Sequence, residues 1–238
     1  MTNSNQITLS VIMPAYNESA AIADAVSEVQ HWVLAPLPAA ELIVVNDGSQ
    51  DDTGKILEGL ASGEPRLRVV NQKNAGHGAA VRTGLELARG EYVFLLDSDR
   101  QVPLEAFPGL WQAAHGHEGA LGVRWPRRDP LFRLLLTRVV RLLLFLLFRV
   151  RLRDANCPFK IFRRSIWTEA RGLIPEGTIT PSLFLAVYMA RRWPSIEQQP
   201  VPHRIRATGV VSIRRWKLVK TCALAFRQLW DFRKKLRI

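Results

Sequence analysis

Two carboxylates separated by a single residue, those of Asp97 and Asp99, are the groups in this sequence best suited to chemistry. They directly follow residues 92–96, an apolar run whose length and composition predict a buried strand. Alternate residues of an extended segment point the same way, so both carboxylates can face one site at the strand end, where open α/β sheets bind ligands. Paired carboxylates beside a phosphate suit Mg²⁺ or Mn²⁺. The alternative interpretation is a polar turn after a strand.

The segments before this pair alternate between strand and helix. Apolar runs predict the strands, while helical periodicity and capping residues predict the helices between them. This alternation is typical of right-handed βαβ units, and it predicts an α/β fold with a mostly parallel sheet flanked by helices. The predicted strands are residues 7–13, 42–45, 67–70 and 92–96, and the predicted helices are residues 19–33, 51–60 and 79–88.

Acidic side chains follow three of the predicted strands. Glu18 comes after the first strand, Asp47 after the second, and Asp97 with Asp99 after the fourth. Because the carboxyl ends of parallel strands meet at one edge of a sheet, these groups are expected to converge there. Folding alone does not explain such convergence, so the sequence predicts a binding site at this edge.

The charge of the chain is unevenly distributed. Its 238 residues, 47% hydrophobic and 23% charged, are enough for one large globular domain. Residues 1–123 hold 7 lysines and arginines against 15 acidic residues, whereas residues 124–238 hold 26 against 6. The second half is therefore expected to meet an anionic partner, and nucleic acid, lipid headgroups and a phosphorylated substrate all qualify.

The cellular compartment follows from the cysteines and the first residues. Cys157 and Cys222 give no disulfide framework and suit a reducing compartment, where both are expected to be packing residues. Residues 1–6 are polar and show no secretory signal. The protein is expected in the cytoplasm or on the cytoplasmic face of a membrane.

Two stretches of the basic half combine arginines with apolar side chains. Residues 131–150 are strongly apolar, but the longest run without charge is residues 142–148, and a spanning helix needs about twenty residues. A helix here either packs in the core with its arginine tips in solvent or lies in a membrane interface. Residues 213–238 read as a basic amphipathic helix with tryptophan and phenylalanine, which is typical of an interfacial membrane helix. A partner-binding helix is the alternative.

Four motifs in order, SVIMPAYNES, VVNDGSQDDT, NAGHGAAVRTGLELARGEY and FLLDSDRQ, resemble the family 2 glycosyltransferases with a GT-A fold. The resemblance covers roughly the first half of the chain. It implies a nucleotide-sugar donor held over the strand ends, with a divalent metal at the D-x-D motif. Carried over by position, it implies a nucleoside pocket of Pro14, Tyr16 and Glu18, a base or ribose contact from Asp47, a nucleotide contact from Asp97 and metal ligation by Asp99.

Three positions depart from the pattern of that family. Asn46 stands where the family often has the first aspartate of a pair, and His77 where a lysine is frequent. His77 either contacts a phosphate or is a loop histidine without a role. Arg100 stands where a small residue or glycine is common, and it is expected to modify the contact with the donor.

Within the family, DSDRQ resembles the D-x-D-x-Q motif of polyprenyl-phosphate sugar transferases of the dolichyl-phosphate mannose synthase type, which adds Gln101 to Asp97 and Asp99 as a metal ligand. The same resemblance extends into the basic half. It implies that arginines, whose planar guanidinium suits phosphates, neutralise the donor diphosphate and the acceptor phosphate. The residues implied are Arg124 in a G-x-R motif, Arg133 and Arg138 five residues apart, Lys160 in a D-x-x-S-G-F-R-like segment with Cys-Pro for Ser-Gly, and Arg206 in an R-x-x-G segment.

The implied function is metal-dependent, inverting transfer of a sugar from a nucleotide diphosphate-sugar, of the GDP-mannose or UDP-glucose type, to a polyprenyl or dolichyl phosphate. Asp99, Arg124 and Arg138 are the implied catalytic residues. The acceptor phosphate has its second pKa near ~6, so no protein base has to deprotonate it. The expected enzyme is peripheral on an anionic membrane surface and could be helped by a membrane-anchoring partner protein, because many relatives carry transmembrane helices that this sequence lacks.

Three alternatives remain. Transfer to a glycan hydroxyl would need a carboxylate base, for which Asp154 is the attractive residue. A nucleic-acid- or membrane-binding protein without catalysis could use the basic half, but no nucleic-acid-binding motif is present and no nucleic acid partner is expected. A non-catalytic relative is the third, against which the intact D-x-D argues. The expected organisation is one GT-A domain over residues 1–212, with a nucleotide-sugar part at 1–123 and an acceptor- and membrane-facing part at 124–212, followed by the helix at 213–238.

Overall fold

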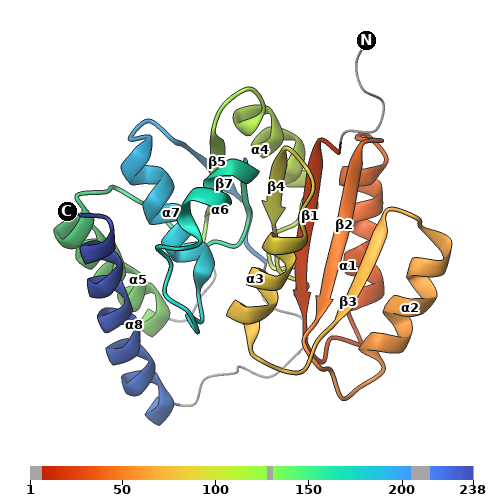
Figure 1. Ribbon diagram of the computed structural model, residues 1–238, viewed down its shortest axis with the longest axis horizontal. Helices are drawn as coiled ribbons and strands as arrows, with labels where there is room; N and C mark the ends of the chain where they lie inside the picture. The colour runs from red at the N-terminus through yellow and green to blue at the C-terminus, as the bar shows by residue number, and fades with distance from the viewer. Residues whose placement is uncertain (1–6, 128–130, 205–214, 238) are drawn as a thin grey trace.

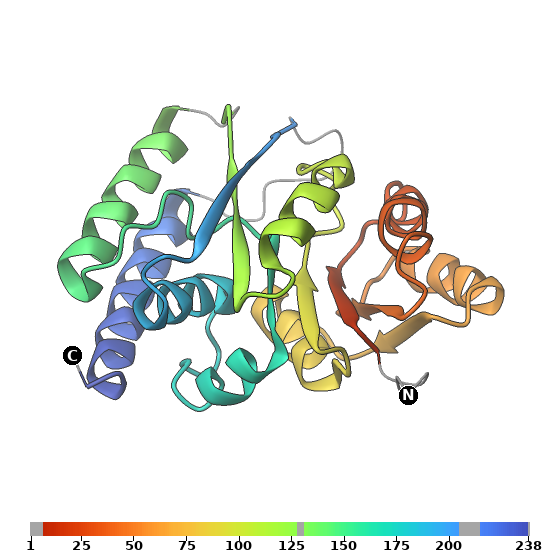
Figure 2. The same ribbon diagram turned by 90° about the horizontal axis from the view of Figure 1, so that it is seen from above.

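One seven-stranded sheet runs through the molecule, with helices on both faces (Figures 1 and 2). The structure is a computed structural model that describes residues 7–127, 131–204 and 215–237. The strands lie in the order β3-β2-β1-β4-β6-β5-β7. This arrangement confirms the predicted α/β fold with a mostly parallel sheet flanked by helices.

The first half of the chain forms the parallel part of the sheet. Its strands are β1 (Leu9–Ala15), β2 (Ala40–Asn46), β3 (Leu67–Asn71) and β4 (Tyr92–Leu95), and its helices are α1 (Ile22–Val29), which continues as a π-helix over Gln30–Leu34, α2 (Thr53–Gly63) and α3 (His77–Leu87). Ile12 of β1 packs into one hydrophobic cluster, whereas its neighbours Val11 and Met13 pack into the cluster on the other face. Burial on both faces is the reason that these strands are unbroken apolar runs.

The rest of the chain, from residue 104 on, completes the sheet and adds an antiparallel strand to it. Its elements are a 3₁₀ turn (Leu104–Ala106), α4 (Phe107–Ala114), β5 (Gly119–Arg124), β6 (Lys160–Arg163), α6 (Arg164–Ala170), α7 (Pro181–Arg192) and β7 (Glu197–Val201). β6 runs antiparallel to both β4 and β5, and its first residue, Lys160, pairs with Leu95 and Leu121. Consequently the start of β6 lies at the same edge of the sheet as the end of β4.

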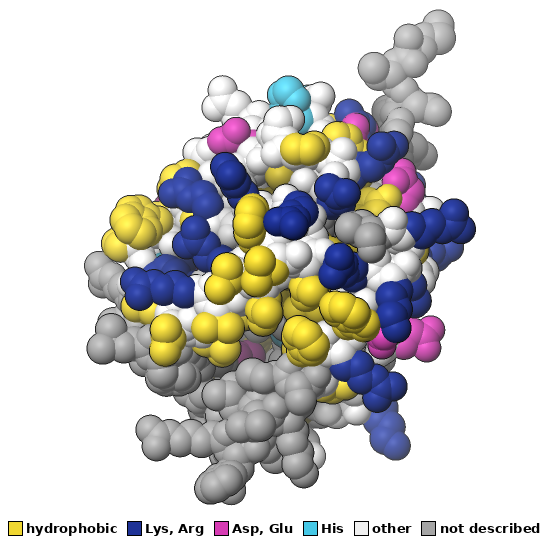
Figure 3. All heavy atoms as spheres, turned by 90° about the vertical axis from the view of Figure 1, so that its left-hand side faces the viewer, with side chains coloured by type: hydrophobic (Ala, Val, Ile, Leu, Met, Phe, Trp, Pro, Cys, Tyr) yellow, Lys and Arg dark blue, Asp and Glu magenta, His cyan; other side chains and the backbone are white. Residues whose placement is uncertain are grey.

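Two long helices, α5 (Leu131–Phe148) and α8 (Arg215–Lys235), lie side by side against α7 (Figures 1 and 2). Their inner faces join the core, where the Phe232 ring lies 5.9 Å from the ring of Phe148 and 5.1 Å from that of Phe184. Their outer faces form a surface on which hydrophobic and basic side chains are interleaved (Figure 3). No helix in the described part of the chain is long and apolar enough to cross a membrane. The expected boundary at residues 212 and 213 falls outside the described residues.

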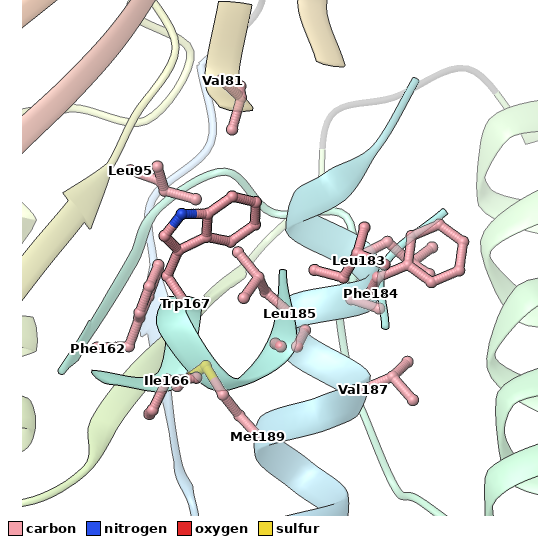
Figure 4. Packing of buried hydrophobic residues seen from close by; sticks show 14 of the residues in the cluster. Val81, Leu95, Phe162, Ile166, Trp167, Leu183, Phe184, Leu185, Val187 and Met189 are labelled. Carbon is pink, nitrogen blue, oxygen red and sulfur yellow. The ribbon is translucent and has the colours of Figure 1, made fainter. Parts of the chain in front are cut away.

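The core on this side is built around Trp167 of α6. Its indole lies between Phe162 of β6 and Leu185 of α7, with Val81 of α3 and Leu95 of β4 beyond it (Figure 4). Trp167 and Leu185 are almost completely buried. This packing joins the second half of the chain to α3 and β4, the elements that carry the predicted site.

Candidate functional site

The predicted site residues from the strand ends meet at one edge of the sheet. Asp97 and Asp99 after β4, Gln101, and Arg124 at the end of β5 line one pocket. Asp97 also lines a second, adjoining pocket, whose wall is formed by Pro14, His77, Asn156, Thr180 and Ser182 together with apolar residues of β1, α3 and β4. The edge therefore combines two carboxylates with cationic and neutral polar groups.

The loops after β1 and β2 are tied together by hydrogen bonds. The amide of Asn17 donates to Ser49 Oγ at 3.0 Å, and the amide of Gln50 donates back to Asn17 Oδ1 at 2.8 Å. The amide of Glu18 donates to Thr53 Oγ1 at 2.9 Å. Glu18 is buried by these contacts, whereas Tyr16 is 44% exposed. The ring of Tyr16 is accordingly the accessible group of the predicted nucleoside pocket.

Asp47 holds the segment that leads into α3. One carboxylate oxygen accepts hydrogen bonds from the amide of Ala75 at 2.9 Å and from Gln72 Nε2 at 2.7 Å, and the other accepts from the amide of Gly76 at 2.8 Å. Asp47 is only 2% exposed. The structure thus gives Asp47 a role in shaping the loop, and its contact with a base or ribose stays a prediction.

His77, the first residue of α3, forms an ion pair with Asp97. Its Nε2 lies 3.0 Å from Asp97 Oδ1. Burial works to lower the pKa of His77, but Asp97, with smaller contributions from the Ile179 backbone and Asp99, raises that pKa overall. Burial likewise works to raise the pKa of Asp97, yet His77, Arg124 and Lys160 hold it below its usual value. His77 therefore lies at the site in contact with Asp97, and its contact with a phosphate stays a prediction.

The turn after β4 presents Asp99 and Gln101 but not Arg100. The amide of Gln101 donates to Asp99 Oδ1 at 3.2 Å, and both side chains line the pocket. Arg100 has a positive φ of 57°, a conformation that favours glycine, which accounts for the small residue common at this position. Its guanidinium binds carboxylates of α1 and does not line the pocket, so any effect of Arg100 on the contact with the donor would be indirect and stays a prediction.

Arg124 is engaged by a buried carboxylate. Its Nε and Nη2 donate to the two oxygens of Asp154 at 2.7 and 3.0 Å, and Arg127 Nη1 lies 3.6 Å from Asp154 Oδ1. Although burial works to raise the pKa of Asp154, the two arginines lower it. A carboxylate held ionised in this way is a weak proton acceptor. Asp154 is thus poorly suited to be the base that transfer to a glycan hydroxyl would need.

Lys160, the first residue of β6, is completely buried. Its amine donates to the carbonyl of Cys157 and to Ser182 Oγ. Burial lowers the pKa of Lys160 to about 8, and burial raises the pKa of the Cys157 thiol to about 11. The charge of Lys160 contributes to the lowered pKa of both Asp97 and Asp154. A direct contact of Lys160 with a phosphate stays a prediction.

Three predicted residues, Arg133, Arg138 and Arg206, remain to be placed. Arg138 is exposed on α5 and is not among the pocket residues. The side chain of Arg133 and the whole of Arg206 lie outside the described residues. Conversely, sequence reasoning missed Asn156, Thr180 and Ser182. Asn156 lies within the motif segment that ends at Lys160 but was not singled out there, whereas Thr180 and Ser182 belong to no motif and reach the edge because α7 packs against α3.

The donor set fits a metal shared with a substrate phosphate. Among the described residues, no group of three or more histidine, cysteine, aspartate or glutamate side chains could hold an ion alone. Mg²⁺ keeps several waters and is typically bound by one or two carboxylates plus substrate phosphates. Asp97, Asp99 and Gln101 around one pocket supply such a partial set of oxygen ligands.

Curated relatives match most of the chain. The undecaprenyl-phosphate 4-deoxy-4-formamido-L-arabinose transferase of Pseudomonas aeruginosa PAO1 is 32% identical over 204 residues, 84% of this chain and 59% of the relative. The protein of that name from Aeromonas hydrophila is 30% identical over 212 residues, 88% of this chain and 64% of the relative. This chain thus spans about three-fifths of the length of these relatives.

Solved structures share the fold. Glucosyl-3-phosphoglycerate synthase from Mycobacterium tuberculosis, in complex with Mn²⁺, uridine diphosphate and phosphoglyceric acid, aligns with a TM-score of 0.71 and 23% identity over 95% of this chain and 78% of that chain. Its complex with uridine diphosphate gives a TM-score of 0.69. The family model described as Glycosyl transferase family 2 matches residues 10–169. Since this match covers well over half of the sequence, the chain belongs to glycosyl transferase family 2.

Proposed function

We propose that this chain is an inverting glycosyltransferase that moves a sugar from a nucleotide diphosphate-sugar to the phosphate of a polyprenyl phosphate at a membrane surface. The observation that carries the proposal is the pocket in which Asp97, Asp99 and Gln101 face Arg124. The names of the relatives support the acceptor class, because they are undecaprenyl-phosphate sugar transferases.

In this proposal, each group of residues at the sheet edge contributes to donor binding. The exposed ring of Tyr16 and the loops held by Asp47 would take the nucleoside. Asp97, Asp99 and Gln101 would hold a Mg²⁺ or Mn²⁺ ion, which supplies positive charge for the leaving diphosphate. Arg124, oriented by Asp154, would add a fixed guanidinium to the same pocket.

The acceptor needs no proton acceptor from the protein. A phosphate monoester is largely a dianion at neutral pH, since its second pKa is near ~6. One of its oxygens would form the new bond to the anomeric carbon while the bond from that carbon to the diphosphate oxygen breaks, which inverts the anomeric configuration. Asp154 is held ionised by two arginines. This arrangement supports a phosphate acceptor over a glycan hydroxyl.

The outer surface of α5 and α8 supports an anionic lipid surface as the partner. Of the eleven exposed large hydrophobic side chains in the described part of the chain, eight lie on these two helices: Leu135, Val139, Leu142, Phe145, Leu146, Leu224, Phe226 and Trp230. Exposed basic side chains lie among them (Figure 3), namely Arg138, Arg141, Arg149, Arg227, Lys234 and Lys235. Apolar side chains with arginines at their level are typical of helices that lie in a membrane interface.

The composition of this surface favours lipid over nucleic acid as the partner. Nucleic-acid surfaces combine basic side chains with a recognised binding motif or with aromatic groups that stack on bases, whereas five of the eight exposed apolar side chains on this surface are leucine or valine. Here Arg149 lies over the ring of Phe145 and Arg233 over that of Trp230, at 5.9 and 5.5 Å. The apolar groups are therefore part of the basic surface, which supports a peripheral position on a membrane. The cytoplasmic face is part of the proposal, from the reducing compartment that the cysteines suit.

Vesicle binding is expected to depend on this surface. The double variant Leu142→Glu, Leu146→Glu should bind vesicles rich in phosphatidylglycerol at least about tenfold more weakly than the wild type, because each change removes apolar area and repels anionic headgroups. Co-sedimentation at fixed ionic strength measures this. The matched control is Ser62→Glu, Gln112→Glu, which adds the same charge at exposed positions of α2 and α4. Equal binding by both variants, or retention on duplex DNA instead of vesicles, would contradict the lipid assignment.

The transfer reaction itself is testable with a donor panel. The protein is incubated with GDP- and UDP-sugars, an extractable polyprenyl phosphate and either Mg²⁺ or Mn²⁺. We expect a lipid-linked sugar from one donor and no product in the presence of a chelator. If the donor binds but the lipid stays unlabelled, while a glycan acceptor is labelled, the acceptor in this proposal is wrong.

A further inference from the structure

Arg100 lies between two predicted metal ligands but directs its side chain away from them. Its Nη1 is 2.6 Å from Asp24 Oδ2, its Nη2 is 2.6 Å from Glu28 Oε1, and its Nε donates to the same Glu28 oxygen at 3.0 Å. Asp24 and Glu28 both belong to α1. The side chain of Arg100 is thus a bridge from the turn after β4 to a helix on one face of the sheet.

The backbone conformation at this position is one that supporting contacts can stabilise. A φ of 57° is in the left-handed region, which L-residues other than glycine seldom adopt, so other contacts must hold the conformation. Arginine suits this work, because its planar fork forms several directed hydrogen bonds with carboxylates. The conformation at Arg100 determines how the flanking residues, Asp99 and Gln101, are directed.

Both ends of the bridge are anchored. α1 is fixed to the core by Ile22, Val26 and Val29, each completely buried. The loop before α1 carries the predicted nucleoside residue Glu18, whose amide is held by Thr53. On the other side of the turn, the carbonyl of Gln101 accepts a hydrogen bond from the amide of Arg204 at 2.8 Å. Arg100 therefore links the turn of the metal ligands to the structure that carries the nucleoside loop.

We propose that Arg100 is a positioning residue whose ion pairs with Asp24 and Glu28 direct Asp99 and Gln101 into one pocket and so set the affinity for a divalent cation with a nucleoside diphosphate. The inference rests on the proposed function in one respect only, that Asp97, Asp99 and Gln101 hold the cation. It assigns Asp24 and Glu28, which do not line the pocket, a part in positioning the same metal ligands.

The test is Mn²⁺ binding, measured by the electron paramagnetic resonance signal of free Mn²⁺ in the presence of UDP or GDP and without any acceptor. Arg100→Gly keeps the freedom for a positive φ but loses the ion pairs, and Asp24→Asn, Glu28→Gln removes only the partners. Each is expected to weaken Mn²⁺ binding roughly tenfold, as for other residues that orient metal ligands. The combination of all three changes should weaken binding no further, because the groups act as one unit.

A matched control and a second readout keep the outcome clear. Arg171→Ala breaks another ion pair, with Glu86 at 3.0 Å, and should leave Mn²⁺ binding unchanged. Nucleotide affinity measured without metal should also be unchanged in the Arg100 and α1 variants. If Mn²⁺ affinity is unaltered in these variants, the inference about Arg100 is wrong but the proposed function stands. The same holds if the variants lose metal-free nucleotide affinity by the same factor as Mn²⁺ affinity. No Mn²⁺ binding by the wild type with either nucleotide would overturn the inference together with the proposed metal site.

Discussion

Replacement of Asp99 by asparagine is expected to lower the rate of sugar transfer at saturating substrates by roughly 10²- to 10³-fold, the range seen when one charge-stabilising group of an active site is removed. Asparagine has the same shape and can still accept the hydrogen bond from the amide of Gln101. What is lost is the negative charge and one hard oxygen ligand for the metal. The fold should be unaffected, because Asp99 lies in the turn after β4 and lines an open pocket.

The measurement is the turnover number with the best donor of the panel, together with the affinity for the nucleotide without metal. The metal-free affinity for the nucleotide should stay within about threefold of the wild-type value, because Asp99 is expected to bind the metal. A threefold change corresponds to less than about 1 kcal/mol. Glu58→Gln, which removes one negative charge at an exposed position of α2, is the matched control and should retain full activity. A turnover number near that of the wild type in Asp99→Asn would show that the metal is held elsewhere or is not needed.

Replacement of Asp154 by alanine is expected to lower the free energy of unfolding by about 3 to 5 kcal/mol, the cost of breaking a buried ion pair from one side. The side chain of Asp154 is only 2% exposed and that of Arg124 only 13%. The variant leaves both Arg124 and Arg127 without their shared carboxylate. Chemical denaturation at pH 7 measures the loss. Glu105→Ala is the control: its pair with Arg204 is half exposed on both sides, so its loss should cost less than about 1 kcal/mol.

The same carboxylate predicts a pH dependence of stability. The folded pKa of Asp154 lies below its unfolded value of about 3.9. Its contribution is therefore fully present above about pH 4 and is lost as the pH falls through the lowered folded pKa. The difference in unfolding free energy between wild type and Asp154→Ala should shrink as the pH is lowered from 5 towards 3. If this difference stays constant over the range, the ionised Asp154 does not account for the stability that the variant loses.

The parallel strands could be read from the sequence because burial on both faces produces unbroken apolar runs. β1, β2, β3 and β4 each overlap the predicted strand, although β1 extends two residues further, through Pro14 and Ala15. β6 and β7 gave no such signal. β6 has four residues, and β7, with the sequence EQQPV, lies at the edge of the sheet with mostly polar side chains. Strands of this kind are fixed by their neighbours rather than by their own pattern.

The long basic helix shows why one pattern supported two interpretations. From residues 131–150 alone, packing in a core and lying on a membrane were alternatives. In the structure α5 buries Leu144 and Phe148 against α7 and α8, while Leu142 and Leu146 remain exposed. A helix that is apolar on nearly all sides can have two apolar faces, and only its packing decides which one is covered.

The sequence by itself determined where the strands β1 to β4 lie along the chain, the edge at which Asp97 and Asp99 gather, and the family, because apolar periodicity and local motifs are properties of short segments. Tertiary structure alone decided the partners of the charged groups. Arg124 and Asp154, thirty residues apart in the sequence, form a buried ion pair. Lys160 is enclosed and donates to Ser182, and Arg100 binds the carboxylates of α1. The energy of an ionised group depends on its burial and on charges a few ångströms away, and both are set by chain segments distant in sequence.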